Sequence, residues 1–135
     1  MDRLTGEFTI DHSRASTTLL FDIRRRQWHQ PFLSELDIDE DKLPRPVACD
    51  EVVGAINDAA AGRTGLKAGT PVVGGCMDTI GASLGTGVLD EGQCFVIMGT
   101  AARVAGPVRT ATFDPRFMNC THISDNCWQY IGAIN

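Results

Sequence analysis

The sequence lacks long apolar segments, and this lack argues against a membrane protein. No run approaches the ~18 apolar residues of a membrane-spanning helix, and the acidic, mixed start in residues 1–7 does not resemble a secretory signal. Internal repeats and low-complexity tracts are missing as well. The 135 residues, of which 43% are hydrophobic, are therefore expected to form a folded cytoplasmic protein with no membrane partner.

Positive charge is scarce, because 12 basic residues stand against 17 acidic ones and the net charge is −5. Nonspecific binding of nucleic acid needs a positive surface, so this balance disfavours it. Residues 24–26 are three arginines, but Asp22 and the acidic residues 37–41 flank them. We interpret this cluster as a solvated face and predict no nucleic-acid partner.

The five cysteines form no C-x-x-C pair, and their odd number fits a reducing compartment. Cys120, His122 and Cys127 match no standard zinc spacing, so no metal site is predicted from protein ligands. A cysteine hydrolase that uses His122 is disfavoured, because the sequence contains no nucleophile elbow. His12, His29 and His122 are interpreted as surface or turn residues.

Two strand ends carry the residues best suited to chemistry. An apolar run at 71–74 leads through glycines to Asp78, and a second run at 95–98 leads to Gly99 and Thr100. A carboxylate just past a buried strand is a candidate general base, because apolar walls fix its position. A Gly-Thr turn is a candidate phosphate contact, because its glycine lets an oxyanion approach the backbone and its hydroxyl adds a donor.

Both features also have simpler interpretations. Asp78 suits the N-cap of a helix over residues 79–84, and spacing alone does not separate this role from catalysis. A Gly-Thr pair after a strand, such as Gly99 and Thr100, is most often an ordinary turn.

The pattern along the chain alternates strands and helices and then changes to hairpin-forming strands. We expect helices at 17–23, with a strand as the alternative, at 30–36, from Asn57 to about 62–65, and at 79–84. We expect a polar turn at 11–16, an extended connector at 43–46 and strands at 52–56, 71–74, 94–98, 102–105, 110–113 and 128–131. The change of pattern at 84–91 indicates a boundary between two α/β units. Helices that should cover the second sheet are missing, so we expect a fragment.

In chain order, these motifs resemble the FGGY carbohydrate kinases, which include xylulose, gluconate and glycerol kinases. The matching pieces are residues 9–17, 20–23, 28, 43–44, 65–72, 74–78, 85–87, 98–100 and 130–135. Single pieces are weak signals, whereas nearly the whole chain in the order and spacing of the family is a strong one.

The resemblance implies part of a ribonuclease-H-like, actin-like ATPase fold of the α/β class. Residues 1–86 would be the C-terminal part of the N-terminal domain, and residues 87–135 the beginning of the C-terminal domain. Asp78 would be the general base that takes the proton of the attacking sugar hydroxyl, while Gly99 and Thr100 would lie at the phosphate end of ATP. The implied cofactors are ATP and Mg²⁺, and the implied partner is a small sugar; a homodimer is left open.

Some positions differ from the family pattern. Thr79 stands where many members carry Gln or Asn, and we expect the sugar to contact Asp78 and Thr79. Residues 101–103 replace a further glycine and an aromatic residue. A pentulose-like sugar is the expected substrate. Most of the nucleotide site lies outside the chain, so the isolated 135 residues are expected to be inactive; the alternative is a sugar- or nucleotide-binding remnant without catalysis.

Overall fold

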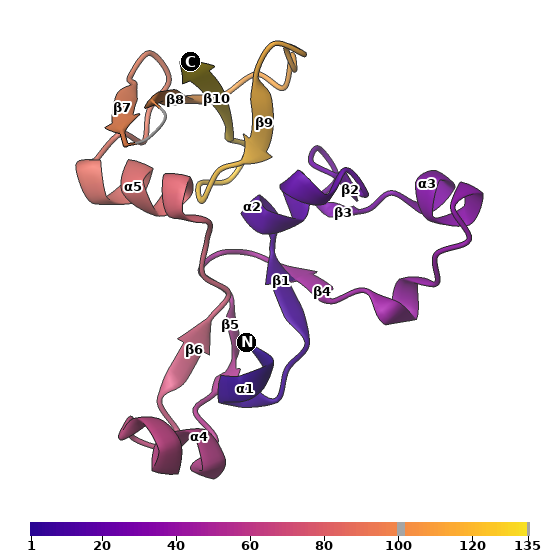
Figure 1. The fold of residues 1–135 in the computed structure, drawn as a ribbon, viewed down its shortest axis with the longest axis vertical. Coiled ribbons are helices and arrows are strands. Elements are labelled where there is room, and N and C mark those ends of the chain that lie inside the picture. Colours follow the sequence, from indigo (N-terminus) through magenta and orange to yellow (C-terminus); the bar gives the residue numbers. More distant parts are fainter. Residues whose placement is uncertain (100–101, 135) are drawn as a thin grey trace.

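The computed structural model describes residues 1–99 and 102–134, and Figure 1 shows their arrangement. The helices are short. They are α1 (Asp2–Thr5), α2 (His12–Ala15), α3 (Gln30–Glu35), α4 (Asp58–Thr64) and α5 (Asp78–Thr86), with 3-10 turns at Ser16–Thr18 and Glu40–Lys42. None of the helices within these described ranges is long and apolar enough to cross a membrane.

The strands divide into three small sheets and one larger one. The small sheets pair β1 (Thr9–Asp11) with β4 (Arg45–Val47), β2 (Phe21–Asp22) with β3 (Gln27–Trp28), and β5 (Val52–Ala55) with β6 (Pro71–Val73). The larger sheet contains β7 (Phe95–Met98), β8 (Ala102–Val108), β10 (Trp128–Ile134) and β9 (Met118–Thr121), in that order and all antiparallel. In Figure 1, α5 joins the part that contains β5 and β6 to this four-stranded sheet.

The structure confirms most of the predicted elements. These are the elements that short apolar runs and capping residues mark clearly in the sequence. The helix expected after Asn57 is α4, where the Asn57 side chain accepts a hydrogen bond from the Ala60 N–H at 2.8 Å. Gly65 ends this helix with a left-handed φ of 75°. The strands expected at 52–56, 71–74, 94–98, 102–105 and 128–131 are β5, β6, β7, β8 and β10, and the helix expected at 30–36 is α3.

The helix predicted at 17–23 is wrong, and the strand alternative is nearer to the structure. The Thr18 hydroxyl donates to the carbonyl of Ala15, and Leu19 then adopts a left-handed φ of 64° that ends the 3-10 turn. The chain continues as strand β2. The β-branched threonines therefore close a turn here instead of extending a helix.

Three further expectations are corrected. Residues 110–113 form no strand, because Phe113 has a φ of 38° that a strand cannot contain, and β9 supplies the strand at this edge of the sheet. The connector expected at 43–46 is extended, but its second half belongs to β4, which pairs with β1 in parallel. The polar stretch at 11–16, interpreted as a turn, holds the end of β1 and all of α2.

Within the described residues, the core contains two apolar clusters. The first contains Ala15, Phe21, Trp28 and Leu33, and the indole Nε1 of Trp28 donates to the Pro44 carbonyl at 3.0 Å. The second joins Ala105, Cys120 and Ile131 across the four-stranded sheet. All five cysteines are free thiols, and burial raises the pKa of Cys120 to about 11. Buried Cys120 thus packs as a small core residue.

Hydrogen bonds tie the four-stranded sheet to the segment that follows α2. The Ser16 hydroxyl accepts from the Thr121 N–H at 3.1 Å, and the Trp128 indole donates to the Ile23 carbonyl at 2.9 Å. Arg26 donates to the Ser124 carbonyl at 3.2 Å. These bonds hold the sheet against residues 16–26.

His122 is buried, so its interpretation as a surface or turn residue is wrong. The side chain is 2% exposed, and its Nδ1 accepts from the Ser124 N–H at 3.2 Å, which leaves the ring proton on Nε2. Nε2 lies 3.2 Å from the Ser83 hydroxyl of α5, which in turn donates to the Val88 carbonyl. The chain of bonds therefore needs a neutral imidazole.

The stability of the protein is expected to fall below pH 6.5, because burial and then the charge of Arg109 lower the pKa of His122. Below pH 6.5 the unfolded chain binds a proton at His122 that the folded chain does not bind. The contribution of neutral His122 to the free energy of unfolding is therefore full above pH 6.5 and is lost as the pH decreases. Burial lowers the pKa of His12 as well, so His12 changes the stability with pH in the same direction. Thermal unfolding between pH 8 and pH 5 measures the effect.

The variant His122→Gln separates the contributions of His122 and His12 to the pH dependence of stability. Glutamine can donate to Ser83 but cannot take up a proton, so the variant should lose part of the pH dependence and keep the share of His12. An unchanged pH dependence in His122→Gln would contradict this assignment.

Candidate functional site

The loop between β6 and α5 is held close to the backbone of an earlier segment. The Gly74 N–H donates to the Glu51 carbonyl and the Gly75 N–H to the Cys49 carbonyl, each at 2.9 Å. A Cβ on Gly74 would overlap with the carbonyl oxygen of Ala48, and Gly75 has a φ of 75°. Only glycine permits this close approach at the first position and this conformation at the second without strain.

Asp78 is the first residue of α5, and its carboxylate is exposed. Its Oδ1 accepts from the Thr79 N–H at 2.7 Å and from the Thr79 hydroxyl at 3.2 Å. Met77, not Asp78, occupies the cap position, and no side chain caps the helix there. The carboxylate is therefore held in place from one side and accessible from solvent.

Thr79 follows Asp78 in α5 and is only 1% exposed. Its hydroxyl reaches the carboxylate of Asp78, so in this structure it orients that group. The predicted contact of Thr79 with a sugar stays a prediction.

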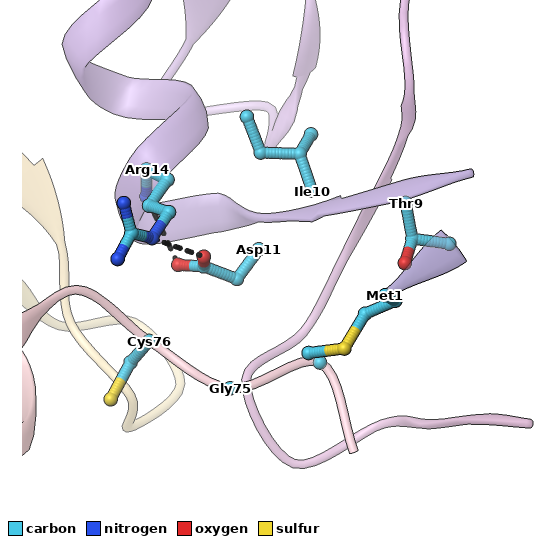
Figure 2. A pocket seen from close by; sticks show the side chains of 8 residues that line it. Met1, Thr9, Ile10, Asp11, Arg14, Gly75 and Cys76 are labelled. Carbon is cyan, nitrogen blue, oxygen red and sulfur yellow. Dashed lines mark hydrogen bonds and ion pairs between the residues drawn. The ribbon is translucent and has the colours of Figure 1, made fainter. Parts of the chain in front are cut away.

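A pocket of about 260 Å³ opens beside the same loop. Figure 2 shows its lining, in which Asp11 and Arg14 face the turn formed by Gly75 and Cys76. Asp11 is 4% exposed, its Oδ1 accepts from the Arg14 N–H at 3.0 Å, and its Oδ2 lies 3.8 Å from Arg14 Nε. The end of β1 and the loop that leads to Asp78 thus line one pocket.

Reasoning from the sequence did not assign a role to Asp11 or Ser13. The Asp-x-Ser order after the β-branched Thr9 and Ile10 is the available signal, because Asp is a preferred helix N-cap after a strand. In the structure Asp11 caps α2, and the hydroxyl of Ser13 contacts the loop before α5.

The second predicted strand end is only partly described. Gly99 is exposed and directly follows β7. Thr100 lies outside the described residues. Their contact with phosphate stays a prediction.

The carboxylates do not form a metal site by themselves. Within residues 1–99 and 102–134 no group of three His, Cys, Asp or Glu side chains could hold a metal ion. Mg²⁺ in kinases binds one or two carboxylates together with phosphates and water, so a complete ligand set is not expected from the protein alone.

Comparison with known proteins identifies the family. The sequence profile of the N-terminal domain of the FGGY carbohydrate kinases matches residues 1–85. The chain belongs to the FGGY family of carbohydrate kinases. Its similarity to individual members agrees with this assignment and confirms the resemblance inferred from the motifs.

Two curated relatives show the extent of the similarity. Autoinducer-2 kinase of Klebsiella pneumoniae is 39% identical over 98 residues, which are 73% of this chain and 18% of that kinase. Xylulose kinase of Escherichia coli is 33% identical over 99 residues, which are 73% of this chain and 20% of that kinase. The FGGY chain therefore spans about a fifth of the length of the curated relatives it matches.

Solved structures confirm the fold. Xylulose kinase from Rhodospirillum rubrum superposes with a TM-score of 0.92 and 27% identity, over 99% of this chain and 28% of that protein. Plasmodium falciparum glycerol kinase with ADP gives a TM-score of 0.86 at 20% identity, over 99% of this chain and 28% of that protein. The chain thus has part of the ribonuclease-H-like, actin-like ATPase fold, as the family resemblance implies. The division into domains at residues 86 and 87 stays a prediction.

Proposed function

We propose that the protein containing these residues is an ATP- and Mg²⁺-dependent kinase that phosphorylates a hydroxyl group of a pentulose-like sugar. Membership of the FGGY family supports the reaction class. The observation that carries the proposal is the exposed carboxylate of Asp78, which a glycine turn and Thr79 hold at the start of α5.

Asp78 would act as the general base. Phosphoryl transfer depends on positioning and charge neutralisation, with one group to accept the proton of the attacking hydroxyl. The carboxylate of Asp78 can accept this proton from a sugar hydroxyl within hydrogen-bond reach. The two bonds from Thr79 to Oδ1 would hold the carboxylate in one orientation, so that Oδ2 faces the substrate.

Gly99 and Thr100 would contact the nucleotide. A backbone N–H at an exposed glycine and a neighbouring hydroxyl can both donate to a phosphate oxygen. When bound, ATP supplies the γ-phosphoryl group and Mg²⁺ offsets part of its charge. In this proposal residues 1–86 and 87–135 belong to two domains, and the sugar and the nucleotide meet between them.

The isolated 135-residue chain is expected to turn over no ATP with any pentulose. It holds the proposed base and one proposed phosphate contact, while most of the nucleotide site would come from other segments. A coupled assay of ADP release, run on the purified chain with a panel of pentuloses, measures this. Sugar-dependent ADP release above the rate without protein would contradict the prediction.

The complete protein tests the proposed function itself. We expect ATP-dependent phosphorylation of at least one sugar in a panel of pentuloses, pentitols, hexuloses and glycerol. Absence of phosphorylated product from every member of the panel would contradict the proposal.

A further inference from the structure

Ser13 connects α2 to the loop that carries Asp78. Its side chain is fully buried, and its hydroxyl oxygen accepts from the Met77 N–H at 2.9 Å, although 64 residues separate the two. The same hydroxyl donates to Oδ1 of Asp11. A short chain of bonds therefore leads from Asp11 through Ser13 to Met77.

The direction of these bonds is fixed. The Met77 N–H can only donate, so the Ser13 oxygen must accept, and the single hydroxyl proton must point elsewhere. Oδ1 of Asp11 receives that proton and also the Arg14 N–H at 3.0 Å. Asp11 thus orients the Ser13 hydroxyl so that its lone pair faces Met77.

Met77 is the position at which this restraint has most effect. It is the N-cap of α5, has no side-chain cap, and directly precedes Asp78. The other end of the loop is held by the bonds from Gly74 and Gly75 to the earlier segment. The bond to Ser13 therefore restrains the backbone of the residue that directly precedes the helix.

We propose that Ser13 and Asp11 are positioning residues for Asp78, acting through the Met77 N–H. This inference rests on the proposed role of Asp78 as general base. Neither residue needs to touch the substrate. Their effect is to keep the carboxylate of Asp78 at one place relative to the attacking hydroxyl, and small displacements of a catalytic group lower rates steeply.

Amide hydrogen exchange in the complete protein tests the restraint directly. Ser13→Ala removes the acceptor, so the Met77 N–H should exchange about tenfold faster. Ser34→Ala is the matched control, because Ser34 is exposed on α3, and it should leave the exchange of Met77 unchanged. Unchanged exchange of Met77 in Ser13→Ala would overturn the proposal.

Kinetics of the same protein test the consequence. Ser13→Ala and Asp11→Ala should each lower kcat about ten- to a hundredfold with little change in the KM for ATP. The double variant should be no slower than the slower single variant, because both changes break one chain of bonds. Asp11→Asn keeps an Oδ1 acceptor for Ser13 and Arg14, so it should retain more activity than Asp11→Ala.

Three results would overturn the proposal: wild-type kcat in Ser13→Ala, losses that multiply in the double variant, or equal loss in Asp11→Asn and Asp11→Ala. Circular dichroism of each variant shows whether it is folded at the assay temperature. Asp78→Asn, measured alongside, separates the two levels of inference. Full activity in Asp78→Asn refutes the proposed base, whereas loss there with wild-type Ser13→Ala refutes only the positioning role.

Discussion

Asp78→Asn is expected to lower the kcat of the complete protein by about 10²- to 10⁴-fold, the usual contribution of a positioned general base. Asparagine has nearly the same size as aspartate and can still accept the Thr79 N–H. It cannot take up the proton of the sugar hydroxyl. The start of α5 should therefore stay in place while the chemical step is lost. Steady-state kinetics with saturating ATP and sugar measure the effect.

Asp58→Asn is the matched control for this experiment. Asp58 is also an exposed aspartate at the first position of a helix, α4. Its replacement removes the same charge from the same kind of helix position, so it reports any general effect of that loss. We expect kcat to stay at the wild-type value.

The two possible failures of Asp78→Asn have different meanings. Full activity would leave Asp78 only its role at the start of α5. A raised sugar KM with unchanged kcat would make it a binding residue that does not accept the proton. The proposal requires a large fall in kcat with sugar binding retained.

Gly74→Ala is expected to have the largest effect on stability. The added Cβ would overlap with the Ala48 carbonyl oxygen, a backbone atom that cannot rotate away as a side chain can. The loop or the Ala48 segment must move, which also strains the bond from the Gly74 N–H to Glu51. Overpacking of this kind lowers the free energy of unfolding by about 1–3 kcal/mol. Urea denaturation measures it.

Gly62→Ala is the control for this substitution. Gly62 lies in α4, and a Cβ there would meet no atom within 4 Å. Alanine favours the helix over glycine, so the free energy of unfolding should rise by about 0.5–1 kcal/mol. A Gly74→Ala protein as stable as Gly62→Ala would show that the loop can move without cost, contrary to our expectation.

Local sequence signals predicted the elements whose causes are local. Asn57 and Gly65 mark the two ends of α4, and the apolar runs that form β6 and β7 read as strands without further information. The short strand β1 gave no such signal. Its three residues become a strand by pairing with β4, and Thr9 there lies opposite Arg45, far along the chain.

The candidate site divides in the same way. Asp78 follows an apolar run and glycines, so its place after a strand could be predicted. The bond from Ser13 to Met77 and the burial of His122 could not, because each depends on a partner distant in sequence. The amino-acid composition predicts neither the bond from Ser13 to Met77 nor the burial of His122. Polar residues such as these look like surface residues until tertiary structure supplies their partners.

The bonds from Thr121 to Ser16 and from Trp128 to Ile23 each join residues 105 positions apart. The entropy cost of closing a loop grows with the logarithm of its length. Joining these residues costs about 1.4 kcal/mol more than joining Val52 to Val73, whose loop is about five times shorter. Folding would thus pair β5 with β6 before the four-stranded sheet docks, so residues 16–26 would wait longer for their partners in that sheet.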